Sequence, residues 1–431
     1  MASGKNKRLV VSMPPRHGKS ELVSKHLPPW WMGTFPGSRV VVASYEHNFA
    51  AWWGQQSRDL MEEWGPATFN CSVRNDSSAR DEWGLTNGST FLARGVGGPI
   101  TGRGADLLVV DDPVKNAEEA FSPVLRQKAW DWWQSTVRTR VEPGGSIIVM
   151  ATRWHRDDLL GRILANATDK TPWREIRIPA IAEENDAIGR NVGEPLWPSR
   201  YDAEALDQIR LDVGPYVWQA LYQQSPRAEG GVEWPSDCFD DFIWVDAMPQ
   251  SELICMALDP SMGKDSKVGD YSAIVVVAIT PDLLYVDAIV ERMNATTIIE
   301  HLYRFAEKYK PHHVGIETNQ WQELLVKEAS GKVAEFNGYW LSNAIKMGDP
   351  IVHIENMHKK ELRIRRLSQY VMRKQLRFVR SPGCKLLVEQ MRDFPAGEHD
   401  DGPDALEMAI RLPYLVFGGM DADPHFRMSG E

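Results

Sequence analysis

The residues with the most specific chemistry form a short loop near the start of the chain. A hydrophobic segment, Arg8–Ser12, runs into the sequence MPPRHGKS, whose last three residues are Gly18, Lys19 and Ser20. This ending is typical of a P-loop, in which glycine lets the backbone approach a phosphate, lysine reaches the β- and γ-phosphates and serine holds Mg²⁺. The amides that open the following helix also favour an anion. Because Met13 replaces the first glycine of the full pattern, an ordinary strand-to-helix turn is the alternative interpretation.

Two adjacent carboxylates end a second hydrophobic segment, LLVVDD. Burying a bare charge is costly, so carboxylates at the end of a buried strand need a partner, and Mg²⁺ can be that partner. We expect Asp111 to orient the metal ion and Asp112 to polarise the attacking water. Two solvated acids in a surface loop are the alternative.

Other polar residues are candidates for contacts with the phosphates. Thr152 follows the hydrophobic segment SIIVMA, and a polar tip on such a strand can sense the γ-phosphate. Arg16, within the loop, and Arg103, in the sequence GRGAD, compete for the role of an arginine finger, which stabilises charge on the transferring phosphoryl group. A loop arginine more often pairs with water or with an acid at the surface. The residues expected to bind nucleotide are Arg16, His17, Gly18, Lys19, Ser20 and Thr152, with Mg²⁺ held by Ser20 and Asp111.

A separate set of carboxylates lies in the C-terminal half of the chain. Asp259 ends the segment LICMALD, Glu317 ends HHVGIE, and the sequence HDDGPD opens a helical pattern. Acids at two strand ends and at a helix start can converge above a sheet, where oxygen donors suit Mg²⁺ or Mn²⁺. Two such ions about 4 Å apart would clamp the attacking and leaving oxygens of a phosphodiester. The pattern therefore predicts a metal-dependent nuclease centre.

The spacing within HDDGPD leaves the helix ligand open. Asp401 and Asp404 are three residues apart, and Asp400 and Asp404 are four apart, so either pair shares a helix face. Acids at a helix start are also favoured by capping and by the helix dipole alone. Because acids end two strands as well, we favour metal binding. The expected metal ligands are Asp259, Glu317, Asp401 and Asp404, and the first three are the expected catalytic acids.

A basic run, residues 358–380, contains nine Lys or Arg residues and a single Glu. Leu362, Leu367 and Tyr370 keep helical spacing within it, so we expect the basic side chains on the exposed side. Basic faces are usually just solvated, but beside a phosphodiester-cleaving site this one predicts a track for the DNA backbone. The residues assigned to the track are Lys359, Lys360, Arg363, Arg366, Arg373 and Lys374.

The elements that must position these residues alternate between strand and helix. Further strands are expected at Arg39–Ser44, Leu107–Val110 and Ser146–Ala151, with amphipathic stretches such as Asn48–Trp64 and Pro123–Val137 between them. Such alternation predicts a mostly parallel sheet with helices on its faces and ligands at the carboxyl ends of its strands. In the second half we expect strands at Leu253–Leu258, Ser272–Ile279, Leu284–Val290 and His313–Ile316, and helices at Thr296–Lys310 and Asp400–Arg411.

Between the two halves, the alternation of apolar and polar residues fits neither a helix nor a strand. We interpret residues 227–250, which are rich in Pro, Gly and acids, as a linker.

Composition narrows the class of protein. A length of 431 residues suits two or three domains, and four widely spaced Cys argue against a zinc cluster or a disulfide scaffold and fit a reducing cytosol. The polar start is no signal peptide, and no apolar run reaches the ~18–20 residues that would span a bilayer, so we expect neither secretion nor a membrane. The net charge of −10 argues by itself against nucleic acid, but local basic faces decide phosphate binding.

In their order along the chain, these motifs resemble those of the large terminase subunits of tailed bacteriophages. MPPRHGKS is similar to their P-loop, which tolerates loss of the first glycine, LLVVDDPVKN to their acidic motif, IIVMATRWHRDDL to their coupling motif and YQQSP to the close of their motor domain. LDPSMGKDSKVGDYSA, VGIETN and HDDGPDALEMA together are similar to their nuclease motifs. The last also resembles RuvC-type Holliday-junction resolvases, where two acids three apart precede Ala-Leu, and this favours Asp401 with Asp404.

The resemblance implies a P-loop, ASCE-type ATPase domain over residues 1–226 and an RNase H-like α/β nuclease domain over residues 251–417. From its Gly-, Asp- and Met-rich composition, we expect residues 418–431 to be a flexible tail. It implies ATP and Mg²⁺ as cofactors, with Mn²⁺ able to substitute at the nuclease site. The motor would pump double-stranded DNA into a procapsid, and the nuclease would cut concatemers. Expected partners in the host cytoplasm are double-stranded DNA, the portal protein, a small terminase subunit and further copies of the chain in a ring, expected to be a pentamer.

Two departures and two rival functions accompany the resemblance. Relatives often carry Glu where Asp112 stands, and they usually place an adenine-contacting segment before the first strand, where this chain has a short polar lead. A helicase-nuclease of DNA repair is the main alternative, but it would usually need a second motor lobe, and no room for one precedes the linker. A non-enzymatic scaffold with decayed sites is the other, and intact Lys19, Asp111 and Asp259 argue against it.

Overall fold

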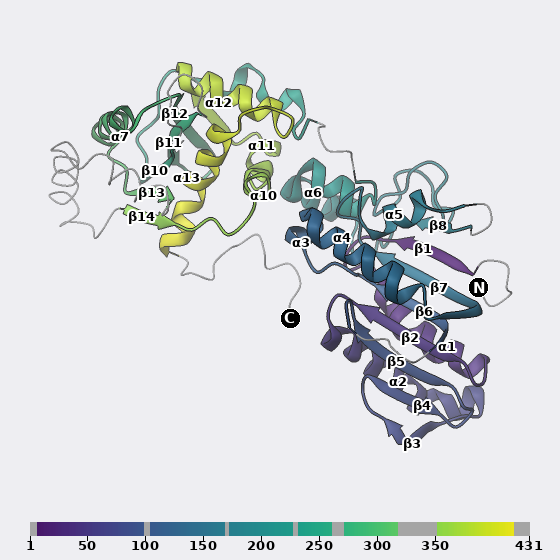
Figure 1. The fold of residues 1–431 in the computed structure, drawn as a ribbon. Helices are drawn as coiled ribbons and strands as arrows, with labels where there is room; N and C mark the ends of the chain where they lie inside the picture. Colours follow the sequence, from purple (N-terminus) through teal and green to yellow (C-terminus); the bar gives the residue numbers. More distant parts are fainter. Residues whose placement is uncertain are drawn as a thin grey trace. The chain divides into compact units, whose positions relative to one another are not determined.

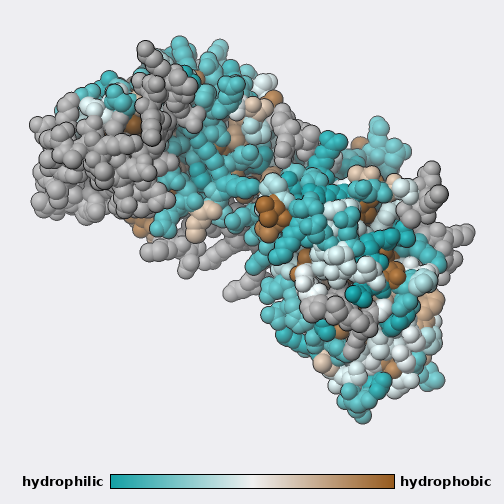
Figure 2. Space-filling model, in the orientation of Figure 1, coloured by the Kyte–Doolittle hydropathy of each residue, from teal (hydrophilic) through white to brown (hydrophobic). Residues whose placement is uncertain are grey.

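The computed structural model describes residues 7–98, 104–168, 172–226, 232–260, 271–317 and 351–417. The chain divides into two compact units, residues 1–209 with 216–228 and residues 210–215 with 229–431. Each unit is built on its own β-sheet (Figure 1). Hydrophilic residues dominate the face in Figure 2, and hydrophobic ones are scattered over it. In the described part of the chain, no helix is both long and apolar enough to cross a membrane.

The first unit contains an eight-stranded sheet in the order β3-β4-β5-β2-β6-β7-β1-β8. The five pairings from β5 to β8 are parallel, and β3-β4 and β4-β5 are antiparallel. The mostly parallel sheet predicted from the sequence is therefore confirmed. The strands are β1 (Arg8–Ser12), β2 (Arg39–Ser44), β3 (Val73–Ser78), β4 (Glu82–Leu85), β5 (Thr90–Gly95), β6 (Ala105–Asp111), β7 (Val141–Ala151) and β8 (Arg174–Arg177).

Helices cover both faces of this sheet because its central strands are apolar on both sides. Val40 and Val42 of β2 pack against α1 and α2, and Val41 and Ala43 of the same strand belong to the opposite core beside α4, η2 and α5. This alternation is the two-residue period of a strand. The helices are η1 (Glu21–His26), α1 (Leu27–Thr34), α2 (His47–Phe69), α3 (Ala117–Phe121), α4 (Pro123–Trp132), η2 (Trp133–Val137), α5 (Leu159–Ala165), α6 (Ala203–Val217) and η3 (Trp218–Tyr222). Residues 210–215 of α6 are counted with the second unit.

The register of the parallel strands brings their carboxyl ends to one edge. Ser12 pairs with Ala151, Ser44 with Asp111, and Asp111 with Met150. The residues that follow β1, β2, β6 and β7 therefore leave the sheet side by side. Ligands in sheets of this kind bind at that edge.

The second unit contains a seven-stranded sheet in the order β14-β13-β10-β11-β12-β15-β9. Strands β10, β11 and β12 form an antiparallel meander, while β13 is parallel to β10 and β14 is parallel to β13. The remaining pairs, β12-β15 and β15-β9, are parallel. The strands are β9 (Trp244–Val245), β10 (Leu253–Asp259), β11 (Ser272–Ile279), β12 (Leu284–Glu291), β13 (His313–Glu317), β14 (Ile351–Ile354) and β15 (Leu376–Val379).

Two cores lie on the two faces of the second sheet. Met256, Leu258 and Val276 pack with α7 on one face, and Ala257 and Val275 lie in the core that α12 and α13 cover on the other. Figure 1 shows α13, in yellow-green, crossing the sheet. The helices are η4 (Ser236–Phe239), η5 (Asp241–Ile243), α7 (Ala295–Tyr309), α10 (Lys360–Arg365), α11 (Ser368–Met372), α12 (Pro382–Asp393) and α13 (Asp401–Phe417).

The segment interpreted as a linker, residues 227–250, differs from that expectation where it is described. Trp234, Phe239 and Ile243 are buried in the core under α12 and α13. The Trp234 indole donates a hydrogen bond to Ser368 Oγ at 2.9 Å and stacks on Phe394. These apolar residues lie in and around short 3₁₀ turns, so their spacing follows neither the helical nor the strand period. The sequence pattern therefore suggests a linker, although the described part of the segment belongs to the second unit.

Candidate active sites

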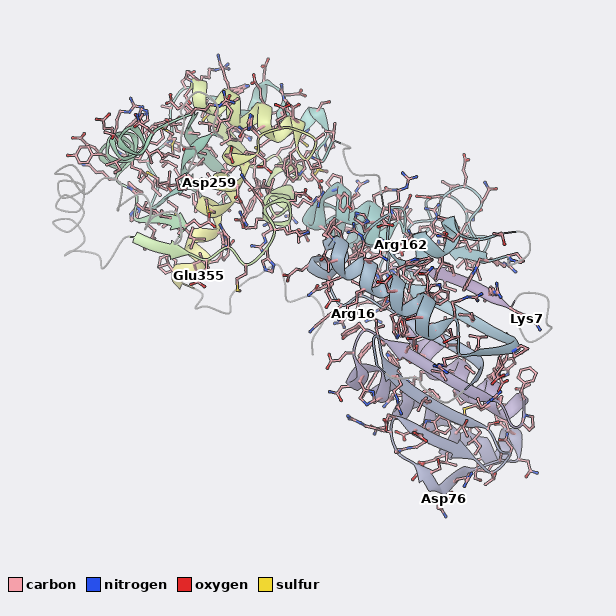
Figure 3. All side chains as sticks on the ribbon, in the orientation of Figure 1. Lys7, Arg16, Asp76, Arg162, Asp259 and Glu355 are labelled. Atoms are coloured by element: carbon pink, nitrogen blue, oxygen red, sulfur yellow. The ribbon has the colours of Figure 1, made fainter. Side chains whose placement is uncertain are left out.

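The loop after β1 turns sharply over the first sheet. Arg16 and Gly18 both have positive φ, 59° and 88°, and the Leu22 amide donates to the Gly18 carbonyl at 3.1 Å as η1 begins. Left-handed backbone is easy for glycine, which explains Gly18 at the point of tightest approach. Arg16 is exposed (Figure 3), whereas Lys19 is buried. The loop therefore turns the lysine inward.

His17 packs and hydrogen-bonds within the protein. Its ring is buried, Nδ1 lies 2.8 Å from the Pro15 carbonyl oxygen, and the ring stacks on Tyr201 with centroids 4.7 Å apart. Burial lowers the pKa of His17, and the nearby arginines Arg200 and Arg190 lower it further. A neutral imidazole that closes the loop is the role these contacts support.

The Lys19 ammonium reaches the acids at the end of β6. Lys19 Nζ lies 2.5 Å from Asp112 Oδ2, and the Ser24 hydroxyl donates to Asp111 Oδ2 at 2.7 Å. Asp111 is fully buried, and its other oxygen, Oδ1, accepts no hydrogen bond. Burial raises the pKa of Asp111 to about 6, Asp112 raises it too, and Lys19 and the hydroxyls of Ser24 and Ser20 oppose the shift. A buried carboxylate oxygen without a partner fits a divalent cation.

Thr152 connects the loop with the acidic strand end. Its amide donates to Asp112 Oδ1 at 3.0 Å, and its hydroxyl donates to the Met13 carbonyl at 3.3 Å. Asp112 is thus held on both oxygens, by Thr152 and by Lys19. Asp112 itself adopts left-handed backbone with φ 44°. Arg103, one of the two finger candidates, lies outside the described residues.

Carboxylates gather in the second unit at the ends of β10 and β13. Leu258 pairs with Ile316, so the next residues, Asp259 and Glu317, end neighbouring strands. Asp401 opens α13, which packs against β10 and β13. Asp259 lies where β10 ends (Figure 3). The structure therefore brings together acids that are far apart in the sequence.

Burial and the neighbouring charged groups shift the pKa of Asp259. Only 8% of its surface is exposed, and burial raises its pKa to about 8. Lys360 opposes the shift, while Asp404, Asp401 and Glu317 add to it. A carboxyl group that is hard to ionise among other acids gains most from a cation.

Lys360 lies among these acids. Its Nζ is 2.5 Å from Asp401 Oδ1, 2.9 Å from Asp400 Oδ1 and 3.6 Å from Asp259 Oδ2. Among the residues that the structure describes, no three or more His, Cys, Asp or Glu side chains form a ready-made metal site. Instead, the Lys360 ammonium lies between the carboxylates. The Asp259 Oδ2 atom is buried and accepts no hydrogen bond, so the donor set still fits a divalent ion.

Asp404, one of the predicted metal ligands, pairs with Arg363. Arg363 donates to it twice, from Nε to Oδ1 at 3.0 Å and from Nη2 to Oδ2. Both residues are buried. Because this bidentate pair uses both carboxylate oxygens, Asp404 serves as an anchor for Arg363 in this arrangement, and Asp401 faces Lys360 instead.

The expectation that the basic run presents an exposed face is wrong for its middle. Arg363 and Arg365 are buried, and Arg365 pairs with Glu233 at 3.1 Å. Arg366 pairs with the buried Glu407 of α13 at 3.2 Å. The basic residues turn inward because buried acids lie opposite them. Those that remain exposed are Lys359, Arg373, Lys374 and Arg380, of which the first three belong to the predicted track.

Sequence reasoning missed the structural role of Glu407. A signal was present, since Asp401, Asp404 and Glu407 follow a three-residue spacing along α13. When one domain contains a row of acids along a helix and a basic run of similar length, the acids and the basic residues are expected to pair with each other rather than with separate ligands.

Together, fold and site define a class. The first unit has a P-loop, an acidic strand end and the strand order of a nucleotide-hydrolysing α/β domain, and the second is an RNase H-like domain, with a central order β12-β11-β10-β13-β14 and acids at its strand ends. The chain belongs to the large terminase subunits: residues 10–220 match the T4-like-virus-type N-terminal domain of the terminase large subunit, and residues 256–412 match the terminase RNaseH-like domain. Members of this family are ATPases that carry a nuclease domain. The helicase-nuclease alternative is not favoured.

Solved structures of phage large terminases are among those to which the chain is similar. The large terminase of a thermophilic bacteriophage, in complex with ADP, is 14% identical, with a TM-score of 0.47 over 96% of this chain and 95% of that one. The HK97 bacteriophage large terminase is 10% identical, with a TM-score of 0.37 over 95% and 92%. The large terminase nuclease of the thermophilic phage G20c is 18% identical, with a TM-score of 0.24 over 36% and 80%. Among curated protein sequences, none matches the chain.

Proposed function

We propose that the first unit binds ATP with Mg²⁺ at the carboxyl edge of its sheet and hydrolyses it. The residues at that edge supply the needed groups. Ser20 and the unpartnered Oδ1 of Asp111 would hold the metal ion, and Lys19 would move from Asp112 to the phosphates. When bound, Mg²⁺ neutralises charge on the phosphate oxygens.

Asp112 is the candidate base for the attacking water. Its Oδ1 stays fixed by the Thr152 amide, while Oδ2 becomes free once Lys19 turns to a nucleotide. The carboxylate then accepts a proton from a water molecule that it orients. Thr152 follows β7, and its hydroxyl donates a hydrogen bond to the Met13 carbonyl at the start of the loop. A movement of the loop on loss of the γ-phosphate would therefore be transmitted to the end of β7.

The proposed task of this hydrolysis is to move double-stranded DNA into a procapsid. The family match supports packaging as the setting, and the finer assignments are our proposals: docking on a portal protein, a small terminase subunit as partner, a ring of five copies and action in the host cytoplasm. The exposed Lys359, Arg373 and Lys374 are the remaining candidates for contact with the DNA backbone.

We propose that the second unit cuts the DNA with two divalent ions. Asp259, Glu317 and Asp401 are the proposed ligands, and Asp404 is left out because Arg363 occupies both of its oxygens. When bound, the metal ions activate water and stabilise the leaving oxygen of the phosphodiester. The observation that carries this proposal is the register of β10 and β13, which puts two acids at neighbouring strand ends.

Two matched variants separate the activities. Lys19→Ala is expected to abolish ATP hydrolysis and leave Mn²⁺-dependent plasmid cutting intact. Asp259→Asn is expected to abolish cutting and leave ATP hydrolysis intact. Asp282→Asn is the control for the second variant, because Asp282 is an exposed acid in the turn between β11 and β12, at the other end of the same sheet. Wild-type cutting by Asp259→Asn would refute the metal centre.

A further inference from the structure

Lys360 occupies the place that a divalent cation would need. Its ammonium contacts oxygens of Asp401, Asp400 and Asp259, at 2.5, 2.9 and 3.6 Å. Two of these acids are among the proposed metal ligands. Since hard divalent ions bind the same carboxylate oxygens, the ammonium and a metal ion compete for one position.

The Asp259 carboxylate is incompletely satisfied by this lysine. Its Oδ2 is buried and accepts no hydrogen bond, and 3.6 Å to the ammonium is beyond hydrogen-bond distance. A desolvated carboxylate oxygen without a hydrogen bond is costly. A metal ion that bonds it directly would remove that cost, so the arrangement favours exchange of one cation for the other.

The position of Lys360 is set by the pair next to it. Lys360 is the first residue of α10, and Arg363, three residues later, is fixed to Asp404. Arg363 Nη1 also donates to the His358 carbonyl at 2.7 Å. The backbone on both sides of Lys360 is thereby held, while its four-carbon stem leaves the ammonium free to swing.

We propose that Lys360 is an internal counter-ion of the nuclease centre. It holds the carboxylates together before metal ions bind, it must swing away when they bind, and it thereby sets the affinity of the centre for divalent cations. The inference rests on the proposed nuclease function and deepens it, because it gives Lys360 a role at the metal site in place of contact with DNA.

Metal binding by the full chain without DNA tests this role. Lys360→Met is expected to bind Mn²⁺ about tenfold more tightly in calorimetry, a change of about 1.4 kcal/mol. Its melting temperature in EDTA should fall, because the acids lose their counter-ion, and should recover with Mn²⁺. Lys360→Arg, which keeps the charge, and Lys385→Met, which changes an exposed lysine of α12, should both resemble wild type. Unchanged or weaker Mn²⁺ binding by Lys360→Met would overturn the inference.

A second measurement needs no variant, so it decides the matter even where Lys360→Met fails to fold. Acetylation of lysines by an N-hydroxysuccinimide ester, read by mass spectrometry, should increase several-fold at Lys360 when Mn²⁺ is added. Lys374, whose Nζ pairs with Asp237 at 2.9 Å, is the internal control and should not change. Equal labelling of Lys360 with and without Mn²⁺ would contradict displacement.

The two proposals fail in different ways. Wild-type protein that neither binds Mn²⁺ nor cuts DNA would refute the nuclease function and the inference with it. Wild-type protein that binds Mn²⁺ and cuts DNA, with Lys360→Met equal to it in affinity, would refute only the role of Lys360.

Discussion

Replacing Arg363 by Met is expected to destabilise the second unit strongly. Arg363 and Asp404 are 7% and 2% exposed and share two hydrogen bonds. Removing one partner of such a buried pair leaves an uncompensated buried charge, at a cost of about 3–5 kcal/mol. For a unit of this size, each kcal/mol corresponds to about 2–4 °C, so the melting temperature of the second unit should fall by about 6–20 °C.

Differential scanning calorimetry of the full chain is the assay, with ADP added to identify the transition of the first unit by its shift. The double variant Arg363→Met, Asp404→Leu should regain much of the lost stability, because apolar replacement of a whole buried pair is often neutral. A fall below about 2 °C in Arg363→Met would mean that the pair is solvated, and would remove the basis for treating Asp404 as an anchor.

Three further changes test other parts of the structure. Thr152→Val should lower the rate of ATP hydrolysis and leave plasmid cutting unchanged, because it removes only the hydroxyl contact with Met13; a parallel loss of cutting would show that the effect is not local. Gly383→Ala should destabilise the second unit by about 1–3 kcal/mol in urea unfolding, because its Cβ would lie 2.0 Å from the Ala288 carbonyl oxygen, and a neutral result would show that α12 can shift. Leu302→Ala, on the buried face of α7, should cost about 2–5 kcal/mol in the same measurement, and a cost below about 1 kcal/mol would argue against tight packing there.

The sequence predicted the parallel core well because its signals are local. Strands such as Arg8–Ser12, Arg39–Ser44 and Ser272–Ile279 are found at the predicted bounds. Short apolar runs that are rich in β-branched residues and bounded by loops favour buried strands. The polar strands β3 and β8 were not predicted. Their side chains are largely exposed, so their pairing comes from neighbouring strands and leaves no hydrophobic pattern.

The partly wrong prediction for the basic run has a physical cause. Sequence spacing predicts which side chains share a helix face, but it does not reveal what lies opposite that face. Arg363 and Arg365 look like surface residues until Asp404 and Glu233, from distant segments, are found beside them. Lys360 poses the same problem, since its position among acids depends on tertiary contacts alone.

The burial of Trp234 bears on where the second unit can be separated from the first. A fragment beginning at Ser251 would lose β9 from the sheet edge, and it would lose Trp234 and Phe239, which leaves Phe394 without the ring that stacks on it. A fragment beginning at Val232 would retain both. Truncation within the segment that the sequence pattern suggested to be a linker would therefore damage the second unit.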